Sequence, residues 1–351
     1  MNETLCPALD AANAAPSATF APPVWLANAH LQSILPSLKL RRPLLARRAR
    51  RLLACTEEHI LDCGGGVRLL GHYSSQQAAG GTPAKQDKKE DLVVLLHGWE
   101  GSADSLYVLS LGSHLFNLGC DVFRLNFRDH GPTHHLNREL FHSCRLDEVV
   151  GAVRSIQKML PDKRLTVAGF SLGGNFALRI AARAPAAGIR LERAVAISPV
   201  LRPHSTMEVL EKGWFVYQQY FIGKWKRSLR IKQQLFPETY DFAPILAQRS
   251  IKAMTQVLVE RYSEFADLDA YLNGYAITGE YLAGLQVPSH ILTALDDPII
   301  PAADLKDLPR NNHLRITAVA NGGHCGFMDR LNSPSWADRQ IAALMGLQRN
   351  S

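Results

Sequence analysis

The order of apolar and amphipathic segments constrains the fold of this chain most strongly. From residue 92 onward, short runs rich in Val, Leu and Ile alternate with longer segments in which apolar residues recur every three to four positions. The apolar runs lie at 92–98, 121–128, 164–170 and 193–198, and the amphipathic segments at 103–119, 146–160 and 172–184. Runs that are apolar on both faces are typical of parallel strands buried between helices. The sequence therefore predicts an α/β fold with a mostly parallel central sheet flanked by helices.

This alternation stops at residue 199 and returns at residue 289. The block 199–284 has helical periodicity and many aromatic residues but no clear strand, so it predicts an all-helical insertion between two strands of one sheet. Strands are then predicted at 289–297 and 313–324, and a closing helix at 336–347. Upstream, 57–63 and 67–74 flank three glycines and predict a β-hairpin. We expect two units: an N-terminal extension, 1–54, and a main domain, 55–348, that carries the insertion. Within them, 1–22 is predicted to be a flexible tail and 74–90 a surface loop.

Composition places the chain among soluble globular proteins. Of its 351 residues, 46% are hydrophobic and 20% are charged, and no apolar run approaches the roughly 18 residues that span a bilayer. The first residues lack the basic and apolar regions of a signal peptide. Six cysteines occur without a C-x-x-C pair, which favours reduced thiols over a disulfide framework or a zinc site. A cytoplasmic location follows as an expectation, with peripheral contact to a membrane as an addition to it.

The positive charge of the chain is local. Its 39 basic and 32 acidic residues give +7, and the stretch 39–51 contains seven Lys or Arg and no acid. A solvated face, or an anchor against neighbouring carboxylates, is one interpretation; a contact with an anionic membrane surface is another. Nucleic acid is not an expected partner, because nothing near this stretch resembles a nucleic-acid-binding fold.

Ser171 stands at a turn between a predicted strand and a predicted helix. The sequence around it reads Gly-Phe-Ser-Leu-Gly-Gly, from Gly169 to Gly174. In a tight strand–turn–helix, glycines two positions before and after the serine let the two elements approach each other closely. The turn lifts the hydroxyl out of the sheet edge, where open α/β folds bind their ligands. This pattern predicts a catalytic nucleophile.

A serine nucleophile needs a base and a carboxylate that orients the base. His324 follows two glycines at the end of the last predicted strand, and Asp296 and Asp297 end the strand before it. The order Ser, Asp, His is the one that this type of fold uses. We assign His324 as the base and Asp297 as the acid, with Asp296 as the alternative.

The segment after the first buried strand predicts the oxyanion hole. The backbone amides of Trp99 and Leu172 would hold the negative charge of a tetrahedral intermediate. His97 is expected to support this loop, and the Trp99 indole to line either the acyl pocket or the core. The five histidines and cysteines at 130–144 match no metal-ligand spacing, so no metal is predicted. No phosphate-binding glycine motif follows a strand, so no cofactor is predicted either.

These motifs resemble the α/β-hydrolase superfamily over about residues 55–348. The segment Asn28–Pro36, "NAHLQSILP", is similar to the N-terminal "NPHLQT-LP" segment of the YheT-like branch, which also contains the eukaryotic abhydrolase-domain proteins 1, 2 and 3. Ala29 replaces the usual proline, and the membrane-spanning N-terminus of the animal members is missing. The resemblance implies a Ser–Asp–His hydrolase, a carboxylesterase or acylglycerol lipase, with the helical insertion as a cap over the serine.

The leading hypothesis from the sequence is therefore hydrolysis of a small-molecule ester or acylglycerol through an acyl-enzyme. A thioesterase or an acyltransferase could use the same triad. A scaffold without catalytic activity that binds a lipid or a partner protein is a further alternative.

Overall fold

An eight-stranded sheet forms the centre of the molecule, and the computed structural model describes residues 19–80 and 90–347 of the chain. The strands have the order β1-β2-β4-β3-β5-β6-β7-β8. β1 and β2 pair antiparallel, β2 and β4 also pair antiparallel, and all further pairs are parallel. The bounds are β1 (Thr56–Asp62), β2 (Arg68–Ser74), β3 (Asp91–Leu96), β4 (Asp121–Leu125), β5 (Arg164–Phe170), β6 (Leu191–Ile197), β7 (Ser289–Ala294) and β8 (Leu314–Val319). The predicted α/β fold class, with its hairpin and mostly parallel sheet, is confirmed.

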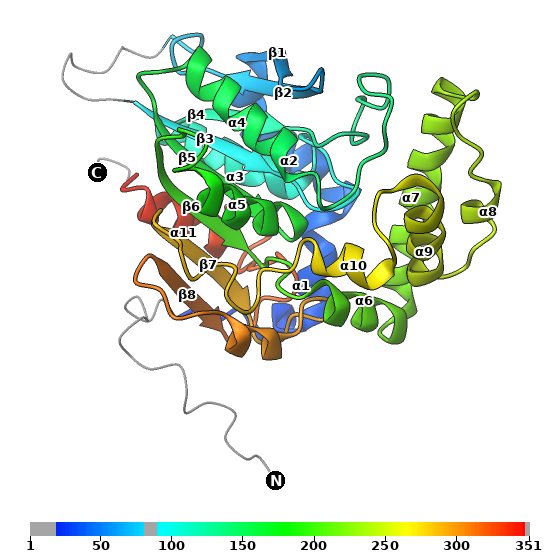
Figure 1. Ribbon diagram of the computed structural model, residues 1–351. Coiled ribbons are helices and arrows are strands. Elements are labelled where there is room, and N and C mark those ends of the chain that lie inside the picture. Colours follow the sequence, from blue (N-terminus) through cyan, green and yellow to red (C-terminus); the bar gives the residue numbers. More distant parts are fainter. Residues whose placement is uncertain (1–18, 81–89, 348–351) are drawn as a thin grey trace.

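Helices cover both faces of the sheet (Figure 1). α4 (Leu146–Met159) and α5 (Leu172–Arg183) pack together on one face, and their apolar side chains join those of the strands in one core cluster. α2 (Arg42–Ala54), α3 (Leu106–Asn117) and α11 (Trp336–Leu344) cover the other face, with a second cluster beneath them. Strands that are apolar on both faces need helices on both sides, because an uncovered face would leave Val and Leu side chains in water.

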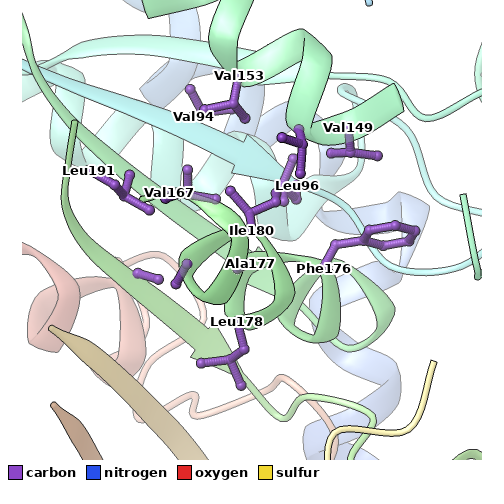
Figure 2. Packing of buried hydrophobic residues seen from close by; sticks show 14 of the residues in the cluster. Val94, Leu96, Val149, Val153, Val167, Phe176, Ala177, Leu178, Ile180 and Leu191 are labelled. Atoms are coloured by element: carbon purple, nitrogen blue, oxygen red, sulfur yellow. The ribbon is translucent and has the colours of Figure 1, made fainter. Parts of the chain in front are cut away.

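The helix that follows Ser171 is the most deeply packed of these elements. Its residues from Leu172 to Ala181 are all buried. Figure 2 shows Phe176, Ala177 and Ile180 among side chains of β3, β5 and the neighbouring helix α4. A helix buried on all sides cannot tilt without opening voids in a core of crystal-like density. The start of α5 is therefore a rigid platform for the residue before it.

The predicted helical insertion consists of five helices between β6 and β7. They are α6 (Pro203–Lys212), α7 (Phe215–Leu235), α8 (Ala243–Leu246), α9 (Ile251–Tyr262) and α10 (Leu268–Asn273), and the described residues in this block include no strand. The helices gather at one end of the sheet (Figure 1). Side chains of α6, α7, α8 and α9 form an apolar cluster with residues of the neighbouring loops, and α10 contributes to a smaller one. We call these five helices the cap.

A buried ion pair joins the cap to the main sheet. The Lys232 ammonium of α7 lies 2.7 Å from an Asp129 carboxylate oxygen in the loop after β4, and the two side chains are only 1% and 7% exposed. Lys232 also donates to the Asn137 carbonyl at 2.6 Å. A pair this deeply buried is costly to separate, because either charge alone would lack a partner. The cap is therefore tied to the loop after β4.

The N-terminal residues are more ordered than the sequence suggests. Phe20 is 7% exposed and packs against the rings of Phe327 and Trp336. The predicted flexible tail is thus wrong at Phe20, because its ring packs in the core against two rings from the last part of the chain. The tail residues 1–18 lie outside the described residues. So do residues 81–89 of the predicted surface loop.

Short helical turns connect Phe20 to α2. They are η1 (Val24–Leu26), α1 (Ala29–Ile34), η2 (Leu35–Ser37) and η3 (Lys39–Arg41), and one more, η4 (Ala302–Asp307), follows β7. Asn28 caps α1 by accepting a hydrogen bond from the Leu31 amide. α1 lies beside the loop that leads from β8 to α11, and Ser33 of α1 bonds to His324 in that loop.

Candidate active site

Ser171 occupies a strained turn between β5 and α5. Its φ of 54° and ψ of −118° lie in a region that non-glycine residues rarely adopt. Such a conformation costs on the order of 1–3 kcal/mol and persists only where the surroundings enforce it. Here the Ser171 amide donates to the Ile197 carbonyl at the end of β6, and its carbonyl accepts from the Asn175 amide. The predicted strand–turn–helix is therefore present, and it leaves the hydroxyl at the carboxyl end of the sheet.

The two glycines that flank the turn permit its tightness. A Cβ on Gly169 would lie 2.1 Å from the Gly173 carbonyl oxygen, and a Cβ on Gly173 would lie 2.4 Å from the His97 carbonyl oxygen. Both distances are shorter than any tolerable contact, and backbone atoms cannot move aside as side chains do. The sequence pattern around Ser171 thus has a steric cause.

His324 and Asp297 form a direct hydrogen bond. Nδ1 of His324 lies 2.9 Å from Oδ2 of Asp297, whose side chain is fully buried. The other Asp297 oxygen accepts from the amides of Ile299 and Ile300, which fixes the carboxylate. Burial of the imidazole, the largest single influence, lowers the pKa of His324, but Asp297 and Cys325 together favour the charged form more strongly and raise that pKa well above its ordinary value.

Asp296 takes a different position from Asp297. One of its carboxylate oxygens accepts from the Gly323 amide at 2.9 Å. Asp296 thus bonds to the backbone of the loop that carries His324, while Asp297 bonds to the ring. Of the two acids that the sequence left open, Asp297 is the one in contact with the imidazole.

Ser171 and the histidine loop meet at the end of β6. The Ile197 carbonyl accepts from the Ser171 amide and also from the Cys325 thiol, and the next residue, Ser198, accepts from the Cys325 amide. The Ser171 hydroxyl has no hydrogen bond to His324 or to any other described side chain. Hydrogen bonds between catalytic groups are often long in proteins without a ligand and tighten when the substrate binds.

The loop after β3 is held by side chains on several sides. Nδ1 of His97 donates to the Gly98 carbonyl at 2.7 Å, so Nε2 must be the atom that accepts from the Phe127 amide. Burial lowers the pKa of His97 to about 4, so the ring is neutral. His97 thus supports the loop, as expected, and the Tyr107 hydroxyl adds a bond to the Gly98 amide.

These bonds fix the direction of the Trp99 amide. A trans peptide group is planar, so holding the Gly98 carbonyl on one side leaves the Trp99 N–H on the other. Within the described part of the chain, neither this N–H nor that of Leu172 has an acceptor. The loop is also close to the serine, since a Cβ on Gly98 would lie 3.3 Å from the Ser171 Cβ. Both predicted oxyanion donors are thus unpaired among the described residues and near Ser171.

A cavity of about 110 Å³ opens beside Ser171 under the cap. Its walls come from the loop after β3, the loop after β4 and the cap helices, and they are mostly apolar. Among the lining residues are Trp99, Phe141, Leu210, Phe221, Trp225 and Leu258. The Trp99 indole therefore lines the pocket, which was one of its two predicted roles. Apolar walls with a polar reactive group at one end suit a substrate with an apolar chain.

The cap helix α7 contacts the loop after β3 directly. Lys224 donates to the Glu100 carbonyl at 2.6 Å. The Trp99 ring stacks on Phe221 with 5.3 Å between centroids and meets the edge of Trp225 at 5.2 Å. These contacts hold the loop after β3 against α7.

Three histidines of the loop after β4 have different partners. His130 bonds to the Arg128 carbonyl, His134 bonds to Ser228 of the cap, and His142 lies 3.4 Å from Glu264. Among residues 19–80 and 90–347, no cluster of three or more His, Cys, Asp or Glu could hold a metal ion. Phe141 and Ser143 from the same loop line the cavity, so this segment forms a wall.

Sequence reasoning missed several residues that hold the site. Tyr107 of α3 bonds to the loop after β3, and Lys232 ties the cap to the loop after β4. Ser33 accepts a hydrogen bond from the His324 amide at 2.8 Å. Ser33 could have been found only through the Asn28–Pro36 motif, which carried no stated role.

The strand order, the strained serine and the paired histidine and aspartate at one sheet edge define an α/β hydrolase. The sequence profile of the family described as "alpha/beta hydrolase fold" matches residues 91–331, more than half of the chain. The chain belongs to this family.

Comparisons with individual proteins agree with this family. The chain is 27% identical to YheT of Escherichia coli (strain K12), which is named as a candidate esterase, over 95% of this chain and 94% of that protein. It is 22% identical to an abhydrolase domain-containing protein of Dictyostelium discoideum, over 92% and 79%. Both matches span nearly the whole chain and support the YheT-like branch.

Among solved structures, the fold resembles that of the Pyrococcus furiosus esterase Pf2001. The TM-score is 0.56 at 14% identity, over 85% of this chain and 94% of that one. At this identity the likeness concerns the fold alone.

Proposed function

We propose that this protein hydrolyses carboxylic esters, of the carboxylesterase or acylglycerol lipase type, through an acyl-enzyme on Ser171. The observation that carries this proposal is the strained Ser171 at the mouth of an apolar cavity, next to the loop in which His324 bonds to Asp297. Strain of this kind costs stability, and the fold maintains it at the position where a nucleophile would be needed.

The steps follow from the chemistry of each group. His324 removes the Ser171 proton as the hydroxyl attacks the ester carbonyl, and Asp297 orients the imidazole and stabilises its charged form. The amides of Trp99 and Leu172 bind the oxyanion. His324 then gives the proton to the leaving alcohol. Water, activated by the same imidazole, releases the acid and restores the serine. No cofactor takes part in this proposal.

In this proposal the cap binds the acyl chain of the substrate. Its helices α6, α7 and α9 supply most of the apolar wall beside Ser171, so the acyl chain lies there and the alcohol faces the His324 loop. A water-soluble ester with an acyl chain of moderate length fits this apolar wall, since each CH₂ group that the wall buries contributes about 0.8 kcal/mol to binding.

A fluorophosphonate probe tests this function. We expect it to label the wild-type protein on Ser171, because an activated serine oxygen displaces fluoride from the probe and becomes a phosphonate ester. An ester series from acetyl to palmitoyl then defines the acyl chain. Parallel assays with thioesters and with competing alcohols separate hydrolysis of esters from thioester cleavage and acyl transfer. A protein that the probe does not label, and that cleaves none of these compounds, would instead fit a non-catalytic scaffold.

A second part of the proposal places α2 against an anionic membrane surface. Its apolar side chains Leu45, Ala49 and Leu52 pack inward, and Arg48 is half-buried. Leu44 and the other four arginines, Arg42, Arg47, Arg50 and Arg51, are exposed. Two of the seven cations at 39–51, Arg41 and Arg48, are attracted by the buried Asp338 carboxylate, and Arg48 bonds to Ser110, which donates to Asp338. These two cations fit the alternative of an anchor against a carboxylate, and the exposed arginines remain for the membrane. Leu40 and Val24, which precede α2, are 88% and 94% exposed. Cationic side chains mixed with exposed apolar ones suit the headgroup region of anionic lipids. No helix of the described residues is long and apolar enough to span a bilayer.

Neutralising α2 is expected to abolish binding to anionic vesicles. The variant changes four exposed arginines to glutamine, at Arg42, Arg47, Arg50 and Arg51. Each cation near an anionic surface contributes about 1 kcal/mol, so the partition coefficient for phosphatidylserine-containing vesicles should fall about a hundredfold or more in a sedimentation assay. The matched control changes four exposed cap arginines instead, at Arg227, Arg230, Arg249 and Arg261. Equal loss in both variants, or binding that ignores anionic lipid, would contradict this part of the proposal.

A further inference from the structure

The segment Asn28–Pro36 lies against the loop that carries His324, although about 290 residues separate them in the chain. This loop runs from residue 321 to residue 328. It is an unusual piece of backbone, because Cys325 and Phe327 have φ values of 61° and 48°. Two non-glycine residues in the left-handed region within three positions cannot hold their conformation by local preference. The loop therefore needs support from outside.

Gln32 supplies part of this support from α1. Its side chain is fully buried. Its amide nitrogen donates to the carbonyls of Met328 and Leu26, and its oxygen accepts from the Met328 amide at 2.8 Å. A single side chain thus satisfies both polar backbone groups of Met328. Buried backbone groups require such partners, so Gln32 fixes the end of the histidine loop.

Ser33 acts on the histidine itself. Its hydroxyl donates to the Ala29 carbonyl at 2.7 Å, which commits its only proton. The oxygen is then an acceptor, and it receives the His324 N–H at 2.8 Å. The backbone of His324 is therefore held from the N-terminal side, while its ring is held by Asp297.

The loop and α1 also touch backbone to backbone. A Cβ on Gly323 would lie 2.4 Å from the Ala29 carbonyl oxygen, and a Cβ on Gly326 would lie 2.2 Å from the Gln32 carbonyl oxygen. At contacts this close, a shift of one segment must move the other, because both contacting groups are backbone atoms and no flexible side chain lies between them. Movement of α1 would therefore shift the loop on both sides of His324.

We propose that α1 is a positioning element for catalysis, in which Ser33 and Gln32 hold the loop 321–328 so that the His324 ring stays bonded to Asp297. This inference rests on the proposed function of His324 as the base. It gives a physical role to the Asn28–Pro36 motif. Neither residue contacts the substrate cavity, so both act through His324.

Removing the Ser33 hydroxyl tests this role. In Ser33→Ala the His324 amide loses its acceptor, and the loop can leave the geometry that the ring requires. We expect turnover of a p-nitrophenyl ester per active site, counted by the burst of nitrophenol, to fall about tenfold or more, since small misplacements of catalytic groups have large effects. Ser33→Thr retains the hydroxyl and should recover most of the loss. The matched control Ser37→Ala removes a hydroxyl from an exposed residue outside α1, and should change turnover less than twofold.

Counting active sites separates positioning from stability. A residue that only stabilised the fold would reduce the number of titratable sites or the melting temperature, and turnover at each remaining site would stay the same. Unchanged turnover per site in Ser33→Ala would overturn the proposal.

A second readout does not depend on activity. The Nδ1 proton shared by His324 and Asp297 gives a downfield NMR signal, which should broaden or disappear in Ser33→Ala and persist in Ser33→Thr. If the wild type neither cleaves esters nor reacts with the fluorophosphonate probe, ester hydrolysis has failed as the function, and this signal alone decides the positioning role. A signal that is the same in wild type and Ser33→Ala would then overturn it.

Discussion

Ser171→Ala is expected to lower kcat for a p-nitrophenyl ester by at least about a thousandfold, because loss of a triad nucleophile removes the covalent route and leaves only binding and the oxyanion hole. The fold should survive, since alanine is smaller than serine and the hydroxyl has no partner among the described residues. Circular dichroism and the melting temperature check this point. The loss should appear in kcat and kcat/KM alike, because the hydroxyl reacts only in the transition state.

Ser143→Ala is the matched control for this experiment. Ser143 also lines the cavity but lies in the loop after β4, where its hydroxyl accepts from Tyr271. We expect less than about a fivefold change in kcat. Activity retained in Ser171→Ala, or an equal loss in Ser143→Ala, would mean that the reacting group is elsewhere.

Asp297→Asn is expected to lower kcat by about 10⁴, as removal of the charge from a triad carboxylate does. The amide can still occupy the site between Ile299 and Ile300, but it neither stabilises the imidazolium nor enforces the tautomer with a proton on Nδ1. Asp296→Asn retains an oxygen that can accept from the Gly323 amide, so the expected loss there is no more than about tenfold. A larger loss in Asp296→Asn than in Asp297→Asn would reverse the assignment.

The same pair of variants should differ in their pH profiles. Burial opposes protonation of His324, attraction by Asp297 favours it, and the net pKa is raised above the ordinary value. A general base must be neutral, so activity rises with pH only as this group loses its proton. The acid limb of kcat/KM should therefore lie above pH 6.5 in the wild type and in Asp296→Asn. In Asp297→Asn the attraction by Asp297 is lost, while burial and the contribution of Cys325 remain, so the pKa falls and the limb should move to lower pH.

Much of the fold could be predicted because its signals are local. A strand buried on both faces, such as Asp91–Leu96, and the glycines around Ser171 leave their pattern within a few residues. The order of these elements then determined the sheet, since parallel strands joined by helices have few arrangements. The same reasoning placed Asp297 and His324 at one edge, because both follow strands of this sheet.

The contacts that hold the site left no such pattern. The hydrogen bonds of Gln32 and Ser33, and the ion pair of Lys232 with Asp129, join residues far apart in the chain. Phe20 was assigned to a flexible tail for the same reason, since the rings that cover it come from the last part of the sequence. The helices of the cap could be predicted from their periodicity, but the cavity beneath them depends on how they pack against one another.

Rapid-quench mass spectrometry of the acyl-enzyme tests the central claim most directly. The wild-type protein is mixed with a p-nitrophenyl ester, stopped with acid within the nitrophenol burst, and digested. We predict one acyl group, on the peptide that contains Ser171, with an amount equal to the burst and no such adduct in Ser171→Ala. An acyl group on another residue, or steady turnover without any acyl-enzyme, would contradict the account.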